Sequence, residues 1–136
     1  MSANVERLRA GYAAFNKREW DVFKDTLTED VVVEQAAAVF DSAPRFEGRE
    51  GVMESQRVLS EAWDDLRYEP LEFYEDGDRV LVINRFSARG HETGIPFEVE
   101  IGHLFTMREG RVATLQVFGT REEALTESGF GDDAEA

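Results

Sequence analysis

The spacing of hydrophobic residues changes near residue 66, from the 3.6-residue period of helices to the two-residue period of strands. The chain before that point contains three amphipathic stripes, each of which predicts a helix. The stripes are formed by Val5, Leu8, Tyr12 and Phe15, by Trp20, Phe23 and Leu27, and by Val52, Gln56, Leu59 and Trp63. Ser2 or Asn4 is suited to cap the first helix. Residues 31–35 predict a strand, and residues 36–47 a loop across the mouth of the fold.

The second half of the chain predicts an antiparallel sheet. Strand patterns cover residues 67–75, 80–89, 97–107 and 112–118, and glycine-containing turns join them. Thr120 and Glu123 then form a capping box for a final helix, which Gly129 ends. Helices followed by an antiparallel meander predict an α+β fold, with helices on one side of a curved sheet.

Both faces of this sheet are apolar, and strand pairing decides which residues share a face. We expect Arg85 to lie opposite Glu100, across the loop at residues 90–95. One face is then aliphatic at depth and charged near one end, which is typical of a pocket with a polar mouth. Its apolar residues are Leu81, Ile83, Leu104, Leu115 and Val117. The other face mixes aromatic residues with Asn84 and His103, a composition that suits a subunit interface and predicts a homodimer.

The composition limits the partners of the chain. Its 136 residues fit one domain over residues 1–130 and an unstructured acidic tail over residues 131–136. A net charge of −14 disfavours nucleic acid, and no apolar run approaches the roughly 20 residues of a membrane span. The chain has no cysteine and no apolar signal-peptide core, so we expect a cytoplasmic protein without disulfides.

Several short motifs, taken in order, resemble a known family. They are YAAFN at residues 12–16, EDVVVE at 29–34, EGREG at 47–51, HLF at 103–105, EGRV at 109–112 and REEAL at 121–125. Together they resemble the SnoaL-like branch of the NTF2-like superfamily over about residues 3–130. The resemblance implies a cone in which a curved antiparallel sheet and three to four helices surround a small-molecule pocket. It also implies a dimer formed through the outer sheet face.

The family's catalytic positions can be compared with this sequence. Ketosteroid isomerases use a strand carboxylate as base, with a tyrosine and a protonated aspartate as oxyanion donors. In this chain those positions fall on Gln35, Gly11 and Gly102, which cannot supply that chemistry. The acid of the polyketide cyclases falls near Val117, and the Asp–Arg–Asp set of the epoxide hydrolases cannot be assembled. The comparison disfavours all three activities.

Three residues are candidates for catalysis if the protein is an enzyme. Glu100 is the candidate acid or base and Arg85 its electrostatic partner, with an ion pair at the sheet rim as the alternative. Strand parity places His103 on the interface face, whereas a register shifted by one residue would make it the best general base.

We expect the ligand to contact eight residues: Tyr12, Trp20, Gln35, Trp63, Ile83, Leu104, Leu115 and Val117. With no cysteine and two distant histidines, we expect no metal and no cofactor. The sequence therefore predicts a small-molecule-binding protein of undetermined ligand, without ketosteroid isomerase activity. The alternative is an isomerase, cyclase, dehydratase or hydrolase that acts on a small apolar substrate by general acid–base catalysis.

Overall fold

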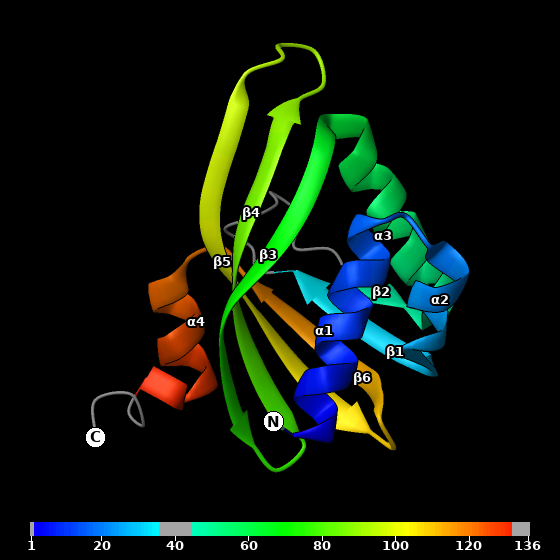
Figure 1. The fold of residues 1–136 in the computed structure, drawn as a ribbon, viewed down its shortest axis with the longest axis vertical. Helices are drawn as coiled ribbons and strands as arrows, with labels where there is room; N and C mark the ends of the chain where they lie inside the picture. Colours follow the sequence, from blue (N-terminus) through cyan, green and yellow to red (C-terminus); the bar gives the residue numbers. More distant parts are fainter. Residues whose placement is uncertain (1, 36–44, 132–136) are drawn as a thin grey trace.

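The structure, a computed structural model, describes residues 2–35 and 45–131, and Figure 1 shows their fold. The predictions for residues 36–44 and for the tail after residue 131 lie outside the described residues. Four helices and six strands follow one another: α1 (Ala3–Asn16), α2 (Trp20–Asp25), β1 (Leu27–Gln35), β2 (Arg45–Glu47), α3 (Gly48–Ala62), β3 (Trp63–Asp76), β4 (Arg79–Gly90), β5 (Pro96–Arg108), β6 (Arg111–Phe118) and α4 (Arg121–Ser128).

The six strands form one curved sheet in the order β2-β1-β6-β5-β4-β3. Neighbouring strands are antiparallel except for β1 and β6, which are parallel. The predicted α+β fold is confirmed, although the sheet is mixed rather than wholly antiparallel. Arg45–Glu47, which we predicted as part of a loop, pairs with β1 as a short edge strand.

The predicted ends of the first and last helices are confirmed. The Ser2 hydroxyl accepts a hydrogen bond of 3.1 Å from the Val5 amide at the start of α1. The Thr120 hydroxyl accepts one of 3.0 Å from the Glu123 amide at the start of α4. Gly129 ends α4 with a φ of 85°, a left-handed conformation that glycine adopts without steric cost.

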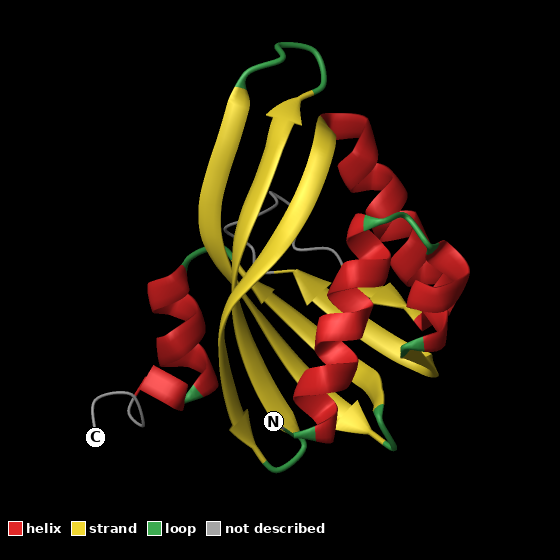
Figure 2. Cartoon of the chain, viewed as in Figure 1, coloured by secondary structure: helices red, strands yellow, loops and turns green. Residues whose placement is uncertain are grey.

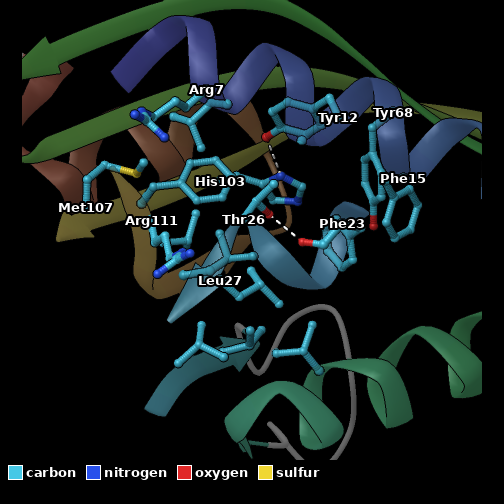
Figure 3. A pocket seen from close by; sticks show the side chains of 18 of the residues that line it. Arg7, Tyr12, Phe15, Phe23, Thr26, Leu27, Tyr68, His103, Met107 and Arg111 are labelled. Atoms are coloured by element: carbon cyan, nitrogen blue, oxygen red, sulfur yellow. Dashed lines mark hydrogen bonds between the residues drawn. The ribbon is translucent and has the colours of Figure 1, made fainter. Parts of the chain in front are cut away.

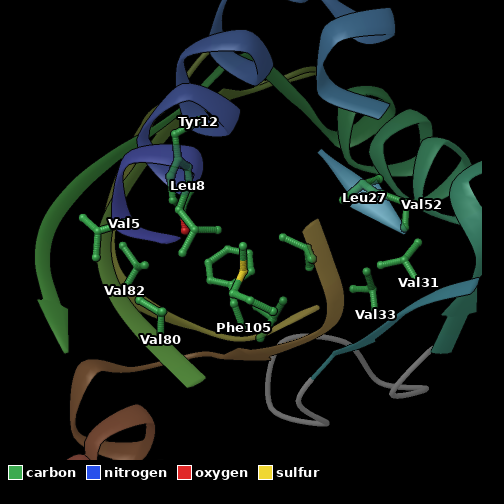
Figure 4. Close-up of a cluster of buried hydrophobic side chains, with 13 residues drawn as sticks. Val5, Leu8, Tyr12, Leu27, Val31, Val33, Val52, Val80, Val82 and Phe105 are labelled. Atoms are coloured by element: carbon green, nitrogen blue, oxygen red, sulfur yellow. The ribbon is translucent and has the colours of Figure 1, made fainter. Parts of the chain in front are cut away.

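The helices cover both faces of the sheet. Helices α1, α2 and α3 lie over the concave face, and α4 lies on the opposite face (Figures 1 and 2). Figure 4 shows the main core, in which side chains from α1, β1 and α3 point toward those of β4 and β5. A second cluster joins α4 to the opposite face through Leu81, Ile83, Leu104, Ala124 and Phe130.

The structure corrects our assignment of the two sheet faces. Arg85 pairs with Glu100 as predicted. However, the face that carries Leu81, Ile83 and Leu104 packs under α4 and does not form the pocket. We had expected all helices on one side of the sheet, and the position of α4 on the other side reverses the roles of the faces.

The pairing of β5 with β6 also differs from our prediction. We expected Leu104 to face Leu115, but Phe105 pairs with Leu115 and His103 with Val117. The pairing shifts after Thr106, where β6 contains one residue more than β5, which is a β-bulge. Because side chains alternate along a strand, the bulge places the inward residues of β6 on the same face as His103.

The surface proposed for a homodimer changes accordingly. Val82, Phe86 and Phe105, which we assigned to that surface, are buried beneath α1, α2 and α3. Thr114 and Gln116 are exposed on the opposite face, on the strand next to β5. A homodimer stays a prediction, and its surface would be polar at these two residues.

Gly102 allows α4 to lie directly on β5. A Cβ atom at this position would lie 2.2 Å from Cβ of Ala124, far inside van der Waals contact. We therefore expect Gly102→Ala to displace α4 and to lower the free energy of unfolding by about 1–3 kcal/mol, as measured by chemical denaturation.

Ala124→Gly provides the matched test of this contact. In the double variant, the new methyl group at position 102 occupies the space that the methyl group of Ala124 leaves. The double variant should then lose less stability than the sum of the two single variants. Strictly additive losses would contradict a direct contact between these two positions.

Candidate functional site

The concave face of the sheet and the helices above it enclose a cavity of about 430 Å³ (Figure 3). Residues from α1, α2, α3, β1, β3, β5 and β6 line it. Its apolar wall includes Val31, Val33, Val52, Phe105, Leu115 and Val117. A cavity of this size and character suits a small organic ligand.

A buried polar cluster reaches this apolar wall through two of its three residues, Tyr12 and His103. It consists of Tyr12 from α1, Asn84 from β4 and His103 from β5, which are 8%, 0% and 5% exposed. The Tyr12 hydroxyl lies 2.7 Å from Nδ1 of His103. The Asn84 amide nitrogen lies 2.9 Å from the Tyr12 hydroxyl and 3.1 Å from Nδ1 of His103. These contacts satisfy polar groups that would otherwise be costly to bury.

Helix and strand periodicity bring these three residues together. Tyr12 lies on the buried stripe of α1. Asn84 pairs with Ile101, and His103 pairs with Val82, so Asn84 and His103 are diagonal neighbours on one sheet face. Cross-strand diagonal neighbours on one face are close enough for long side chains to meet, and Tyr12 reaches both from the helix above.

The cluster carries no charge near neutral pH. Burial lowers the pKa of His103 to about 3, because an imidazolium ion would lose its hydration inside the apolar wall. Burial also raises the pKa of Tyr12 and of Tyr68 above the usual tyrosine range. The cavity therefore presents a neutral imidazole and protonated phenols.

Tyr68 from β3 forms the wall beside this cluster. Its ring centroid lies 5.0 Å from that of His103. The side chain of Asn16, at the end of α1, donates to the Tyr68 carbonyl at 2.7 Å and accepts from the Tyr68 amide at 3.0 Å. This pair of hydrogen bonds fixes β3 against α1. Among the described residues, the Tyr68 hydroxyl has no hydrogen-bond partner.

Charged residues line another part of the cavity: Arg7, Asp25, Glu109 and Arg111, all of which are exposed. Arg111 donates from Nε to the Asp25 carbonyl at 3.0 Å. Figure 3 shows Arg7 and Arg111 on the side of the cavity away from Tyr68. The site thus has an exposed, charged side and a buried, uncharged side.

Half of the residues that we predicted to contact a ligand line the cavity: Tyr12, Gln35, Leu115 and Val117. Trp20 and Trp63 instead pack in a cluster of buried aromatic and aliphatic residues around Phe15 and Phe86. Ile83 and Leu104 lie on the opposite sheet face, against α4. The placement of these last four residues in the pocket is therefore wrong.

Arg85 and Glu100 do not lie at the pocket. Glu100 is exposed and does not line the cavity. Arg85 forms exposed ion pairs with Glu69 at 3.1 Å and with Glu98 at 3.4 Å. Our placement of this pair at the rim of the pocket is wrong, because their shared face is the one opposite the cavity. The alternative that we left open, an ion pair between Arg85 and Glu100, does not form among the described residues either, because Arg85 pairs with Glu69 and Glu98 instead.

His103 was also misplaced, and Asn84 and Tyr68 were not predicted to belong to the site. His103 lines the cavity rather than an interface. A signal for Asn84 is present in the sequence, because it interrupts the alternating apolar residues Val80, Val82 and Phe86 of one strand face. A polar residue at such a position needs a buried partner, and His103 is across the hairpin.

Two other kinds of feature are not found in the described part of the chain. Within residues 2–35 and 45–131, no group of three histidine, cysteine, aspartate or glutamate side chains is arranged to hold a metal ion. None of the helices in the same residues is long and apolar enough to cross a membrane.

Comparison with known proteins gives consistent results. The profile of a family described as "SnoaL-like domain" matches residues 8–115. No curated protein matches the chain. An NTF2-like protein of unknown function from Burkholderia pseudomallei K96243 has a TM-score of 0.79 and 22% identity, over 93% of this chain and 97% of its own.

Two further solved structures have the same fold. TerC, co-crystallised with polyporic acid, has a TM-score of 0.78 and 24% identity, over 93% of this chain and 97% of its own. A putative polyketide cyclase from Sinorhizobium meliloti has a TM-score of 0.69 and 25% identity, over 82% of this chain and 93% of its own. The fold is therefore that of the NTF2-like proteins.

The low pKa of His103 makes stability depend on pH. An unfolded histidine binds a proton near its ordinary pKa of 6.5, whereas folded His103 stays neutral down to about pH 3. The unfolded state thus binds more protons in this range, so stability falls as the pH falls. Relative to His103→Phe, the wild-type free energy of unfolding should fall by about 1.4 kcal/mol per pH unit between about pH 6 and 4.

Chemical denaturation of both proteins at several pH values measures this difference. Subtracting the free energy of unfolding of His103→Phe from that of the wild type at each pH removes the contributions of the carboxylates and of the exposed His91, which the two proteins share. Equal pH dependence in both proteins would show that His103 titrates normally in the folded state.

Proposed function

This chain belongs to the SnoaL-like domain family, and we propose that its cavity binds a small, largely apolar molecule that has one hydrogen-bonding group. The uncharged cluster of Tyr12, Asn84 and His103, of which Tyr12 and His103 line an apolar cavity, is the observation that carries this proposal. A charged ligand group at this position would lose its hydration without gaining an opposite charge. The cluster therefore favours a neutral polar group on the ligand.

Two of the similar structures support a ligand of this kind. TerC was co-crystallised with polyporic acid, and the Sinorhizobium meliloti protein is a putative polyketide cyclase. The cavity of about 430 Å³ falls within the usual range of small-molecule sites. The ring faces of Tyr68 and Phe105, which lie around His103, are suited to packing against a flat ligand.

We also propose that the protein lacks ketosteroid isomerase activity. Gln35 and Gly11, which occupy the positions of the base and the tyrosine, both line the cavity and supply no acid or base. Gly102, at the position of the second acid, contacts α4 on the other face. The base position therefore lacks a carboxylate, and the two oxyanion-donor positions lack a side-chain donor.

An uncharged aromatic probe tests the binding function. N-phenyl-1-naphthylamine should gain fluorescence in the cavity, and filling the cavity should prevent this. Val33 is 4% exposed and lines the cavity, so Val33→Trp should weaken probe binding by about tenfold or more. Val22 is 56% exposed on α2, and Val22→Trp is the matched control without effect. Equal binding by both variants would place the probe outside the cavity.

The second candidate function is catalysis by His103. Its neutral imidazole would donate a hydrogen bond to a ligand carbonyl and stabilise the enolate that forms when water or hydroxide removes a proton beside that carbonyl. The protein should then accelerate exchange of the methyl protons of 2-acetonaphthone with deuterated water, followed by NMR. His103→Phe should abolish this acceleration, and Glu100→Gln should retain it. Exchange no faster than in buffer would leave binding as the function.

A further inference from the structure

We infer that Asn84 decides which ring nitrogen of His103 carries the proton, and that this nitrogen is Nε2. The cavity then offers the Nε2–H group as a hydrogen-bond donor and selects ligands that present a carbonyl-type oxygen to it. This inference rests on the proposed binding function and names the ligand group that the site recognises. Asn84 is a positioning residue in this scheme, since it does not line the cavity itself. Its effect on a ligand passes through Tyr12 and His103.

The direction of the hydrogen bonds follows from what each group can do. The Asn84 amide nitrogen can only donate, so the Tyr12 oxygen accepts from it at 2.9 Å. The hydroxyl proton of Tyr12 is then directed to Nδ1 of His103, 2.7 Å away. The Asn84 amide nitrogen also approaches Nδ1, at 3.1 Å. Two donors therefore face Nδ1, which acts as acceptor, and a neutral imidazole then carries its proton on Nε2.

The assignment of donors and acceptors in these hydrogen bonds depends on the orientation of the Asn84 amide. Its oxygen is enclosed and has no hydrogen-bond partner in the described part of the chain. If the amide were rotated by 180°, two N–H groups would take the place of that oxygen and would be unpaired instead. Burying two unpaired donors costs more than burying one unpaired acceptor. The present orientation is therefore the stable one.

The Nε2 atom is open to the cavity. Only two side-chain polar atoms of residues 2–35 and 45–131 are both enclosed and unpaired, the Thr28 hydroxyl and the Asn84 oxygen. Nε2 makes no hydrogen bond within these residues and is not one of the two, so it contacts the open space that His103 lines. Figure 3 shows Nδ1 of His103 directed to Tyr12 and the rest of the ring in the cavity.

An N–H donor in an apolar wall defines the ligand group. Its partner must be an acceptor, and the lack of charge in the cluster favours a neutral one, such as the carbonyl of a ketone, quinone or ester. A ligand that only donates at this point would face Nε2–H and leave both groups unpaired. The flat apolar body of the ligand would lie against Tyr68 and Phe105.

Nitrogen NMR tests the orientation without any ligand. The chain has two histidines, and His91 is exposed and bonds to Asp64, so His91→Gln leaves a single histidine spectrum. At neutral pH, His103 should show a protonated Nε2 and an unprotonated Nδ1. In Asn84→Asp, the carboxylate would accept from Nδ1, so Nδ1 should become protonated. An Nδ1–H tautomer in the protein that retains Asn84, or an unchanged Nδ1 in Asn84→Asp, would overturn the inference.

A matched pair of ligands tests the selectivity. 2-Acetonaphthone and 2-isopropylnaphthalene have nearly the same shape, and only the ketone has an acceptor. Calorimetry or probe displacement should show the ketone binding roughly three- to tenfold more tightly, the contribution of one net hydrogen bond. His103→Phe should remove the preference, and His91→Gln should keep it. Equal binding of both compounds would overturn the inference alone, whereas binding of neither would overturn the proposed binding function.

Discussion

The contact between α4 and the sheet decides where the functional site lies. The central strands are apolar on both faces, so each face needs a cover. Helix α4 fits closely on one face because Gly102 has no side chain to hold it away from Ala124. The helices α1, α2 and α3 cover the other face, and the cavity lies between them and the sheet. Because α4 fits closely on one face of the sheet, the cavity lies on the other face.

This arrangement explains which parts of the structure could be predicted from the sequence. Helix stripes, turns and caps are local, and the pairing of Arg85 with Glu100 follows from the short loop between their strands. The alternation of side chains along each strand then divides the strand residues between the two sheet faces, but it does not say which face each helix covers. Both sets are apolar here, so the choice depended on the docking of α4, which is a long-range contact with no local signature.

The bulge at β6 limited the prediction of the site in a second way. One extra residue after the turn exchanges the faces of Leu115 and Gln116 relative to β5. Leu115 and Val117 were therefore placed in the pocket through two errors that cancel, a reversed face and a shifted register. His103 had no such compensation and was placed outside. The residues that depended only on helix periodicity or on the end of β1, Tyr12 and Gln35, line the cavity as the pattern indicated.

The asparagine at position 84 bears on the role of the cluster around His103. A valine at position 84 would continue the apolar face formed by Val80 and Val82 and would leave no amide oxygen unpaired. Replacing a buried, incompletely bonded polar network with apolar side chains of similar shape can be neutral or stabilising. Packing alone therefore gives no reason for an asparagine here. A role in orienting the histidine that faces the cavity does, because that role requires a donor at a buried position that has no access to water.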